Sequence, residues 1–208
     1  ARTQRTVKLT RALHFFAQER VTIEEGWPGD VLGIVDTSGE LRIGDTLYKG
    51  PKIEYEGVPS FSPEHFANIE IKDPLKRKQM KKGLDQLTEE GVVQVYRQRD
   101  LGDKDPIAGA VGALQFEVLK HRLKMEYRVD AEIRPLAYSV ARWLKRGEGT
   151  DADLSRAIED FNRREDSCCL IDRDDQPVAL FKSEWAKNWA ENNYPKLIFR
   201  ATAPLRGE

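Results

Sequence analysis

Cysteine is scarce in this chain of 208 residues, and the only two, Cys168 and Cys169, are neighbours. Neighbouring side chains in a strand point to opposite faces, so this pair is poorly placed to form a disulfide. The sequence therefore predicts free thiols and favours a reducing compartment, the cytoplasm. No basic residue or histidine is placed to activate Cys168, which we interpret as a small buried strand residue.

Long apolar runs are also missing. No run approaches the length of a membrane span and no signal-peptide pattern opens the chain, so we expect no membrane partner. Hydrophobic residues make up 39% and charged residues 33%, a balance that is typical of soluble globular proteins. The 34 basic and 35 acidic residues nearly cancel. Any binding of nucleic acid must therefore come from a local patch of charge.

Motifs for catalysis are the third absence. The sequence contains no Gly-x-x-x-x-Gly-Lys-[Ser/Thr], so we expect this chain not to bind or hydrolyse GTP by itself. His14, His65 and His121 lie far apart and lack the spacing of metal ligands. The run Asp-Arg-Asp-Asp at 172–175 lacks the Gly and Glu of a calcium loop and predicts a turn. We predict no enzyme activity, no cofactor and no catalytic or metal-binding residue in this chain.

The first part of the chain has β character. Short runs of strand-forming residues are separated by turn signals at 27–30, 37–40 and 44–45, and they predict strands at 7–10, 12–16, 30–35 and 46–48. The chain opens on Ala1 rather than Met, which suggests either processing or a piece of a longer protein. Prolines and glycines then predict a linker. The domain bounds that we expect are 1–50, 51–65 for the linker, and 66–208.

Residues 66–135 predict a β-α-β-β-α-β unit of the ferredoxin-like, split βαβ type. The first helix has Asp73 as its expected N-cap and Pro74 at its start, and it carries an apolar stripe. Gly91 is the expected end of that helix. Small residues in the strand predicted at 107–113 would let a helix approach its backbone closely. The second helix buries one stripe, which consists of Phe116, Leu119, Leu123 and Tyr127.

The remainder predicts a further α+β extension. We expect a strand at 138–144, a helix at 151–164, a hairpin built from 168–171 and 178–181, and a last strand at 197–200. Ser183 is the expected cap of a helix in which Trp185 and Trp189 lie on one face, and we interpret that face as core. The sequence has no evident internal repeat. The fold class that we predict is therefore α+β.

The one feature with a functional character is a basic cluster around the first helix of the βαββαβ unit. We name it the basic patch, and it consists of Lys72, Lys76, Arg77, Lys78, Lys81 and Lys82. Six cations in eleven residues could follow the phosphates of RNA, but a solvated helix face is an equally good interpretation from charge alone. Weaker clusters are Lys120, Arg122, Lys124 and Arg128, and Arg2, Arg5, Lys8 and Arg11.

Several strings carry a resemblance to a known family. They are Pro-Ser-Phe-Ser-Pro-Glu-His-Phe at 59–66, Asp-Pro-Leu-Lys-Arg-Lys-Gln-Met-Lys-Lys-Gly at 73–83, Glu-Glu-Gly-Val-Val-Gln-Val-Tyr at 89–96 and Val-Gly-Ala-Leu-Gln-Phe-Glu-Val at 111–118. Together they resemble the C-terminal part of the peptide chain release factor three family, a family of bacterial translational GTPases. The strings at 27–33 and 42–47 are similar to the closing strands of the β-barrel domain that translational GTPases share.

The resemblance implies a function as well as a fold. Residues 1–50 would be the end of a translation-factor β-barrel, with the GTPase domain and its GTP and magnesium outside this chain. The chain would bind the ribosome through small-subunit RNA and protein, and the basic patch would contact RNA. The whole protein would promote the departure of the class I release factors that read stop codons.

The alternative that the residues leave open is a free-standing RNA- or protein-binding module with a ferredoxin-like core. Such a module would need exposed aromatic residues on its sheet to stack bases. The predicted strands offer only Tyr96, which argues mildly against this alternative.

Overall fold

The structure, a computed structural model, describes residues 6–7, 12–16, 19–23, 25–36, 41, 44–53, 55, 61–99 and 102–203. The chain forms two compact units, Ala1–Val58 and Pro59–Glu208. The domain bounds expected from the sequence stay a prediction. Among the helices of the described residues, none is long and apolar enough to cross a bilayer.

The first unit contains a small antiparallel sheet. Its strands are β1 (Ala12–Phe16), β2 (Glu19–Ile23) and β3 (Leu32–Ile34), in the order β2-β1-β3. The strand at 12–16 was expected and β2 was not, while the described residues 46–48 form no strand. Most of the strand expected at 7–10 lies outside the described residues. The three described strands of the first unit form an open sheet rather than a closed barrel.

The turn between β2 and β3 follows from its sequence. Pro28 fixes one backbone angle, and Gly29 adopts a φ of 98°, which a residue with a side chain rarely takes. The amide of Asp30 donates to the carbonyl oxygen of Trp27 at 3.0 Å. The Asp30 carboxylate accepts from the amide of Trp27 at 2.8 Å. The predicted turn at 27–30 is confirmed.

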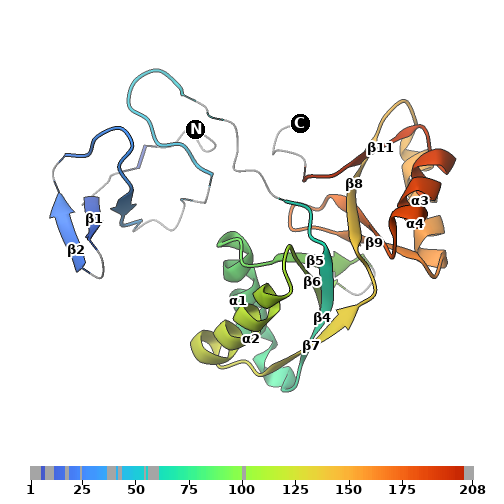
Figure 1. Cartoon of the computed structure of the whole chain (residues 1–208), viewed down its shortest axis with the longest axis horizontal. Coiled ribbons are helices and arrows are strands. Elements are labelled where there is room, and N and C mark those ends of the chain that lie inside the picture. Colours follow the sequence, from blue (N-terminus) through green and yellow to red (C-terminus); the bar gives the residue numbers. More distant parts are fainter. Residues whose placement is uncertain are drawn as a thin grey trace. The chain divides into compact units, whose positions relative to one another are not determined.

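The second unit begins with the predicted βαββαβ order. Its elements are β4 (His65–Ile71), the 3-10 turn η1 (Pro74–Lys76), α1 (Arg77–Glu89), β5 (Gln94–Gln98), β6 (Gly102–Ala110), α2 (Leu114–Tyr127) and β7 (Ala131–Leu136). The strands pair antiparallel in the order β5-β6-β4-β7, which is the ferredoxin-like arrangement (Figure 1). This part of the predicted fold is confirmed.

The same topology then occurs a second time. The following elements are β8 (Val140–Arg146), α3 (Asp151–Arg163), β9 (Ser167–Ile171), β10 (Pro177–Phe181), α4 (Glu184–Asn193) and β11 (Leu197–Arg200). Their order in the sheet, β9-β10-β8-β11, repeats that of the first half, and Arg97 of β5 pairs with Ile171 of β9 to join both halves into one eight-stranded sheet. The sequence shows no repeat because the two halves share a topology and not a set of residues.

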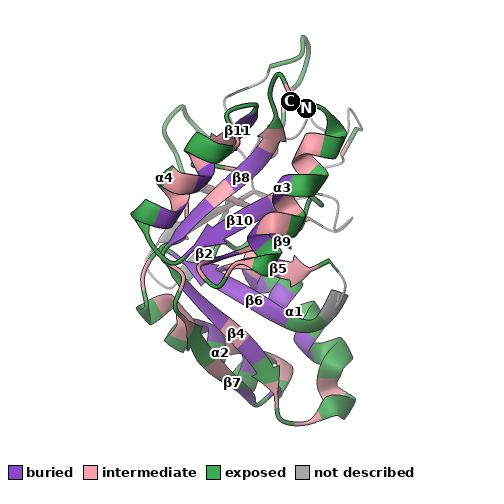
Figure 2. Cartoon of the chain, turned by 90° about the vertical axis from the view of Figure 1, so that its right-hand side faces the viewer, coloured by how far each residue is buried: buried purple, intermediate pink, exposed green. Residues whose placement is uncertain are grey.

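The helices lie outermost on both sides of the unit, with the strands between them (Figure 1). One apolar core lies between α1, α2 and their strands, and a second lies between α3, α4 and theirs. A third core combines strand residues of both halves, including Phe66, Tyr96, Trp143 and Leu180. Figure 2 shows the inner strands buried almost throughout, while the helices keep an exposed face. In each half of the sheet one face is covered by helices, and the other faces of the two halves pack against each other in this third core.

Two predictions about packing were wrong in part. The prediction that small residues of β6 let a helix approach holds for Ala108 and Ala110, which lie in the core beneath α1 and α2. It fails for Gly109, where an added Cβ would meet Pro63 and Tyr96 and no helix. The strand also ends at Ala110 rather than at residue 113. On α4 the expected core role holds for Trp189, which is partly buried against the second core beside Ala186 and Ala190, but it is wrong for Trp185, which is 68% exposed.

Candidate RNA-binding surface

The basic patch is positioned by the start of α1. The Asp73 carboxylate accepts from the amide of Leu75 at 3.0 Å, which satisfies one of the free amides that a helix start exposes. Pro74 follows at the first helical position, as expected. At the other end Gly91 adopts a φ of 75° and lets the chain turn away, which confirms it as the end of the helix.

The apolar stripe of α1 decides which way the patch faces. Met80, Leu84 and Leu87 are at most 4% exposed, because they pack into the first core. The side chains on the other face of the helix must then point to solvent. Lys78 is exposed there, and the adjacent Lys81 and Lys82 are exposed about one helical turn farther along.

The six cations of the patch fall into two groups. Lys72 donates to the Asp130 carboxylate at 3.1 Å, and Lys76 donates to the carbonyl oxygen of Arg128 at 2.6 Å. These two lysines tie the start of α1 to the segment that follows α2. The others are exposed on α1, and they are Arg77, Lys78, Lys81 and Lys82. No local pattern signals the two tethers, because more than 50 residues separate the partners.

The charge at the start of α1 is unfavourable for the helix itself. A helix carries a partial positive charge at its N-terminus, where acidic side chains stabilise it and cations do not. The first turn of α1 contains no acidic residue and contains Arg77 and Lys78. Side chains that break a local stability rule at one surface are typical of sites kept for function.

The second basic cluster meets the first around Asp130. The pKa of Asp130 is lowered chiefly by the hydrogen bond from Lys72, with further contributions from the charges of Lys124 and Lys120. Lys72, which follows β4, and two lysines of α2 therefore act together on this exposed carboxylate. Arg128 sits at the end of α2 with a φ of 56°, in the left-handed region.

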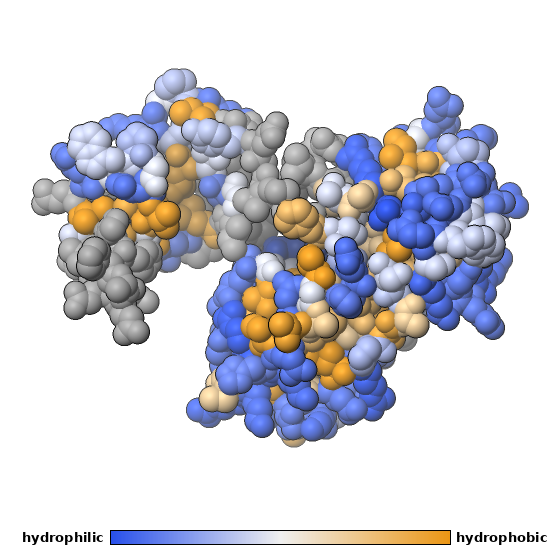
Figure 3. Space-filling view, viewed as in Figure 1, coloured by the Kyte–Doolittle hydropathy of each residue, from blue (hydrophilic) through white to orange (hydrophobic). Residues whose placement is uncertain are grey.

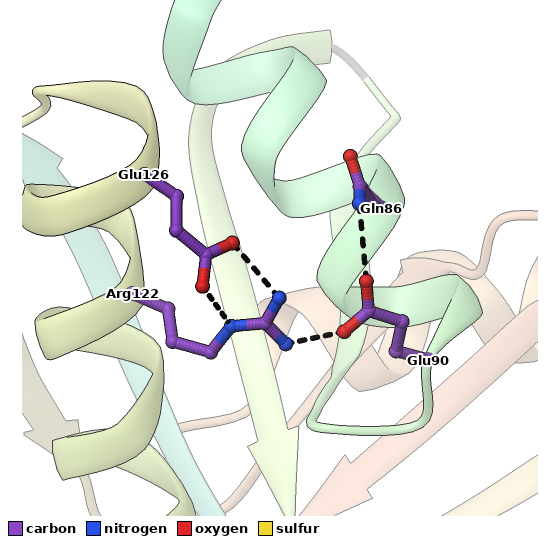
Figure 4. Close-up of polar contacts among 4 residues, drawn as sticks. All are labelled: Gln86, Glu90, Arg122 and Glu126. Carbon is purple, nitrogen blue, oxygen red and sulfur yellow. Dashed lines mark hydrogen bonds and ion pairs between the residues drawn. The ribbon is translucent and has the colours of Figure 1, made fainter. Parts of the chain in front are cut away.

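Arg122 does not belong to this surface, although the sequence grouped it there. Its guanidinium hydrogen bonds to both oxygens of Glu126, at 2.6 and 2.8 Å, and it also contacts Glu90 at the end of α1 (Figure 4). Gln86 donates to the other oxygen of Glu90 at 3.1 Å. Hydrogen bonding to Arg122 lowers the pKa of both carboxyl groups. This network fastens α1 to α2 and leaves Arg122 little capacity for a phosphate.

Other candidate residues are not brought together. The cluster of Arg2, Arg5, Lys8 and Arg11 lies outside the described residues. His65 lies in β4 and His121 in α2, and the described residues contain no group of three potential metal ligands. Burial raises the pKa of Cys168 to about 11 and that of Cys169 to about 12, so both thiols stay protonated at neutral pH. Cys168 lies in strand β9 as we interpreted it, but it is only half-buried, while its neighbour Cys169 is buried.

Comparison with known families bears on the whole chain. The family described as "Class II release factor RF3, C-terminal domain" matches residues 55–191. The chain belongs to this family. The family described as "Elongation factor G domain 2" matches residues 1–50, which lie in the first unit. The resemblance seen in the sequence is thereby confirmed.

Individual relatives agree with the family. A peptide chain release factor 3 of Symbiobacterium thermophilum is 45% identical over 205 residues, which cover 99% of this chain and 37% of the relative. The release factor 3 of Gloeothece citriformis is 44% identical, with 99% of this chain and 36% of the relative covered. The chain thus spans little more than a third of the curated relatives that it matches.

A solved structure supports the fold. A crystal structure of a protein from Thermus thermophilus matches with a TM-score of 0.52 and 21% identity, and the match covers 70% of this chain and 23% of that one. At this identity the likeness speaks for the arrangement of helices and strands alone. It agrees with the predicted α+β fold class.

Proposed function

We propose that this chain is the ribosome-binding C-terminal region of a peptide chain release factor 3, and that the basic patch contacts ribosomal RNA. The family match over residues 55–191 carries the proposal. The exposed cations at the start of α1 support it, because they stand where the helix gains no stability from them. Phosphate contacts by lysine and arginine would position the domain without reading a sequence.

The whole protein would be a ribosome-dependent GTPase that promotes the departure of class I release factors from the small subunit. The sequence of this chain contains no phosphate-binding loop, so GTP and magnesium would be held by a domain outside it. Residues 1–208 would then read out the nucleotide state of that domain as a change of arrangement on the ribosome. A cytoplasmic location stays a prediction.

The alternative of a module unrelated to translational GTPases does not fit the family match. Its stacking mechanism also lacks a platform, because Tyr96 is fully buried between the two halves of the sheet. Among the described residues of the second unit, Trp185 is the one exposed tryptophan, and it lies on a helix.

The test is co-sedimentation of the chain with purified ribosomes over a range of salt concentrations. We expect the variant K78E/K81E/K82E to bind more weakly and to flatten the slope of log affinity against log salt by roughly 2 to 3, since each lost phosphate contact removes about 0.7 to 0.9. The matched control R156E/K182E/K196E carries the same change of charge on exposed cations of the second half. Equal loss in both variants would show a general charge effect and no patch.

A further inference from the structure

The outer face of α2 carries a largely apolar stripe that no other described part of the second unit covers. We define the α2 stripe as Leu114, Val118, His121 and Met125, of which three are apolar and one, the exposed His121, is polar. Leu114 is 80% exposed, Met125 66% and Val118 46%. The opposite face of the helix buries Leu119 and Leu123 in the first core. In the space-filling view an apolar area framed by hydrophilic side chains lies over the part of the molecule that holds α1 and α2 (Figure 3). An exposed apolar patch framed by polar side chains is typical of a protein interaction site.

The spacing of the stripe indicates the shape of that partner. The four residues follow one another at intervals of four, three and four, which is the alternation of a coiled-coil seam. A seam of this kind accepts the side chains of another α-helix as knobs between its own. RNA offers no such surface, so the α2 stripe is distinct from the basic patch.

The charges beside the stripe fit a second α2 helix. In an antiparallel pair centred between Val118 and His121, Leu114 meets the partner's Met125. Glu117 then faces the partner's Lys124, and the same pair forms a second time by symmetry. Both side chains are exposed, and Lys124 also acts through its charge on Asp130. In this pairing the two flanks of the stripe therefore carry opposite charges that face each other.

We propose that the chain associates with a second copy of itself through antiparallel packing of the two α2 helices. One helix pair buries less surface than the roughly 1,200 Å² of a stable standard interface, so the dimer is weak and transient. The proposal goes beyond ribosome binding and does not depend on it, because no residue of the basic patch belongs to the stripe.

The test is sedimentation equilibrium of the whole chain over a series of concentrations, with variants E117K and K124E. Each variant alone replaces two attractive pairs by two repulsive ones and should weaken dimerisation about tenfold. A mixture of the two variants restores opposite charges at both pairs, so the mixed dimer should regain the wild-type affinity. Recovery in the mixture cannot come from misfolding of either variant.

Two further results decide the matter. Val118→Asp places a charge in the centre of the stripe and should leave a monomer with an unchanged circular dichroism spectrum, because its site is outside the core. A wild-type chain that stays monomeric at every concentration overturns the proposal. The proposal is also overturned if the mixture of E117K and K124E associates no better than each variant alone.

Discussion

Asp172 fixes Trp143, a residue of the core that the two halves of the second unit share, and its replacement tests how much that hydrogen bond stabilises the unit. The side chain is 8% exposed and lies in the β9–β10 turn. One carboxylate oxygen accepts from the indole N–H of Trp143 at 2.9 Å. The other accepts from the amides of Asp174 and Gln176, at 2.8 and 2.9 Å. The predicted turn at 172–175 is confirmed, and its first residue also fixes the largest side chain of the third core.

The substitution Asp172→Asn keeps the shape and removes one acceptor. The remaining oxygen can still serve the two turn amides, so the new NH₂ group must face the indole N–H of Trp143. A hydrogen bond to a charged group contributes about 1.5–3 kcal/mol, and a buried donor left without a partner costs about 1–3 kcal/mol. The two free energies largely describe the same lost hydrogen bond, so they are not added. We therefore expect a decrease of about 2–3 kcal/mol in the free energy of unfolding.

Urea unfolding followed by circular dichroism at the helical band measures this change, since α1 to α4 all lie in the second unit. Asp175→Asn is the control in the same turn, because Asp175 is exposed and forms only a surface ion pair with Arg97 at 2.9 Å, so its replacement should change stability by less than about 1 kcal/mol. A double-mutant cycle with Trp143→Phe should give a coupling of at least about 1 kcal/mol. Additive effects, or equal stability of the Asp172→Asn and control variants, would refute the reasoning.

Three more predictions concern the contact between α1 and α2. Gly83→Ala should destabilise the unit by about 1–2 kcal/mol in urea despite the better helix former, because the added Cβ would lie 2.8 Å from the buried Leu123 side chain. Arg128→Gly should raise stability by up to about 1 kcal/mol in the same assay, since Gly adopts the φ of 56° without strain. The hydrogen bond from Arg122 lowers the pKa of Glu90 in the folded state below its ordinary value of 4.5. The stability that this interaction contributes is therefore fully present above pH 4.5, and it is lost as the pH falls through the folded-state pKa. The difference in unfolding free energy between the wild type and Arg122→Gln should therefore shrink in acid, which urea titrations at several pH values measure.

Local signals predicted the elements of the second unit well. Asp73 and Ser183 cap helices as expected, and the hairpin of β9 and β10 lies where the turn residues placed it. Each of these rests on interactions between residues a few positions apart. The burial of the two tryptophans of α4 could not be predicted from such signals. Their spacing puts Trp185 and Trp189 on one face of the helix, but only tertiary packing decides which side chains are buried. Arg164 covers the ring of Trp189 at 3.7 Å, a contact that no local pattern announces.

The candidate site shows the same division. Helical periodicity predicted that Lys78, Lys81 and Lys82 face solvent, and the buried stripe of α1 makes them do so. That Lys72 and Lys76 are tied to the segment after α2 depends on how the two helices pack, which no window of the sequence contains. The RNA contact itself stays a prediction, since exposure permits binding and does not demonstrate it.

The repeated topology adds an internal comparison that sharpens this prediction. Helices α1 and α3 occupy equivalent places in the two halves. Helix α3 starts with a capping box between Thr150 and Asp153 and has two acidic residues in its first turn, as helix stability favours. Helix α1 has Arg77 and Lys78 in its first turn, and its acidic cap, Asp73, lies one turn earlier, before η1. Because both helices cover equivalent strands, the stability of the helix alone does not account for the difference in charge between their first turns. If the cations of α1 serve only solubility, replacing Arg77 and Lys78 by Glu should stabilise the chain and leave ribosome binding intact; we expect greater stability together with weaker binding.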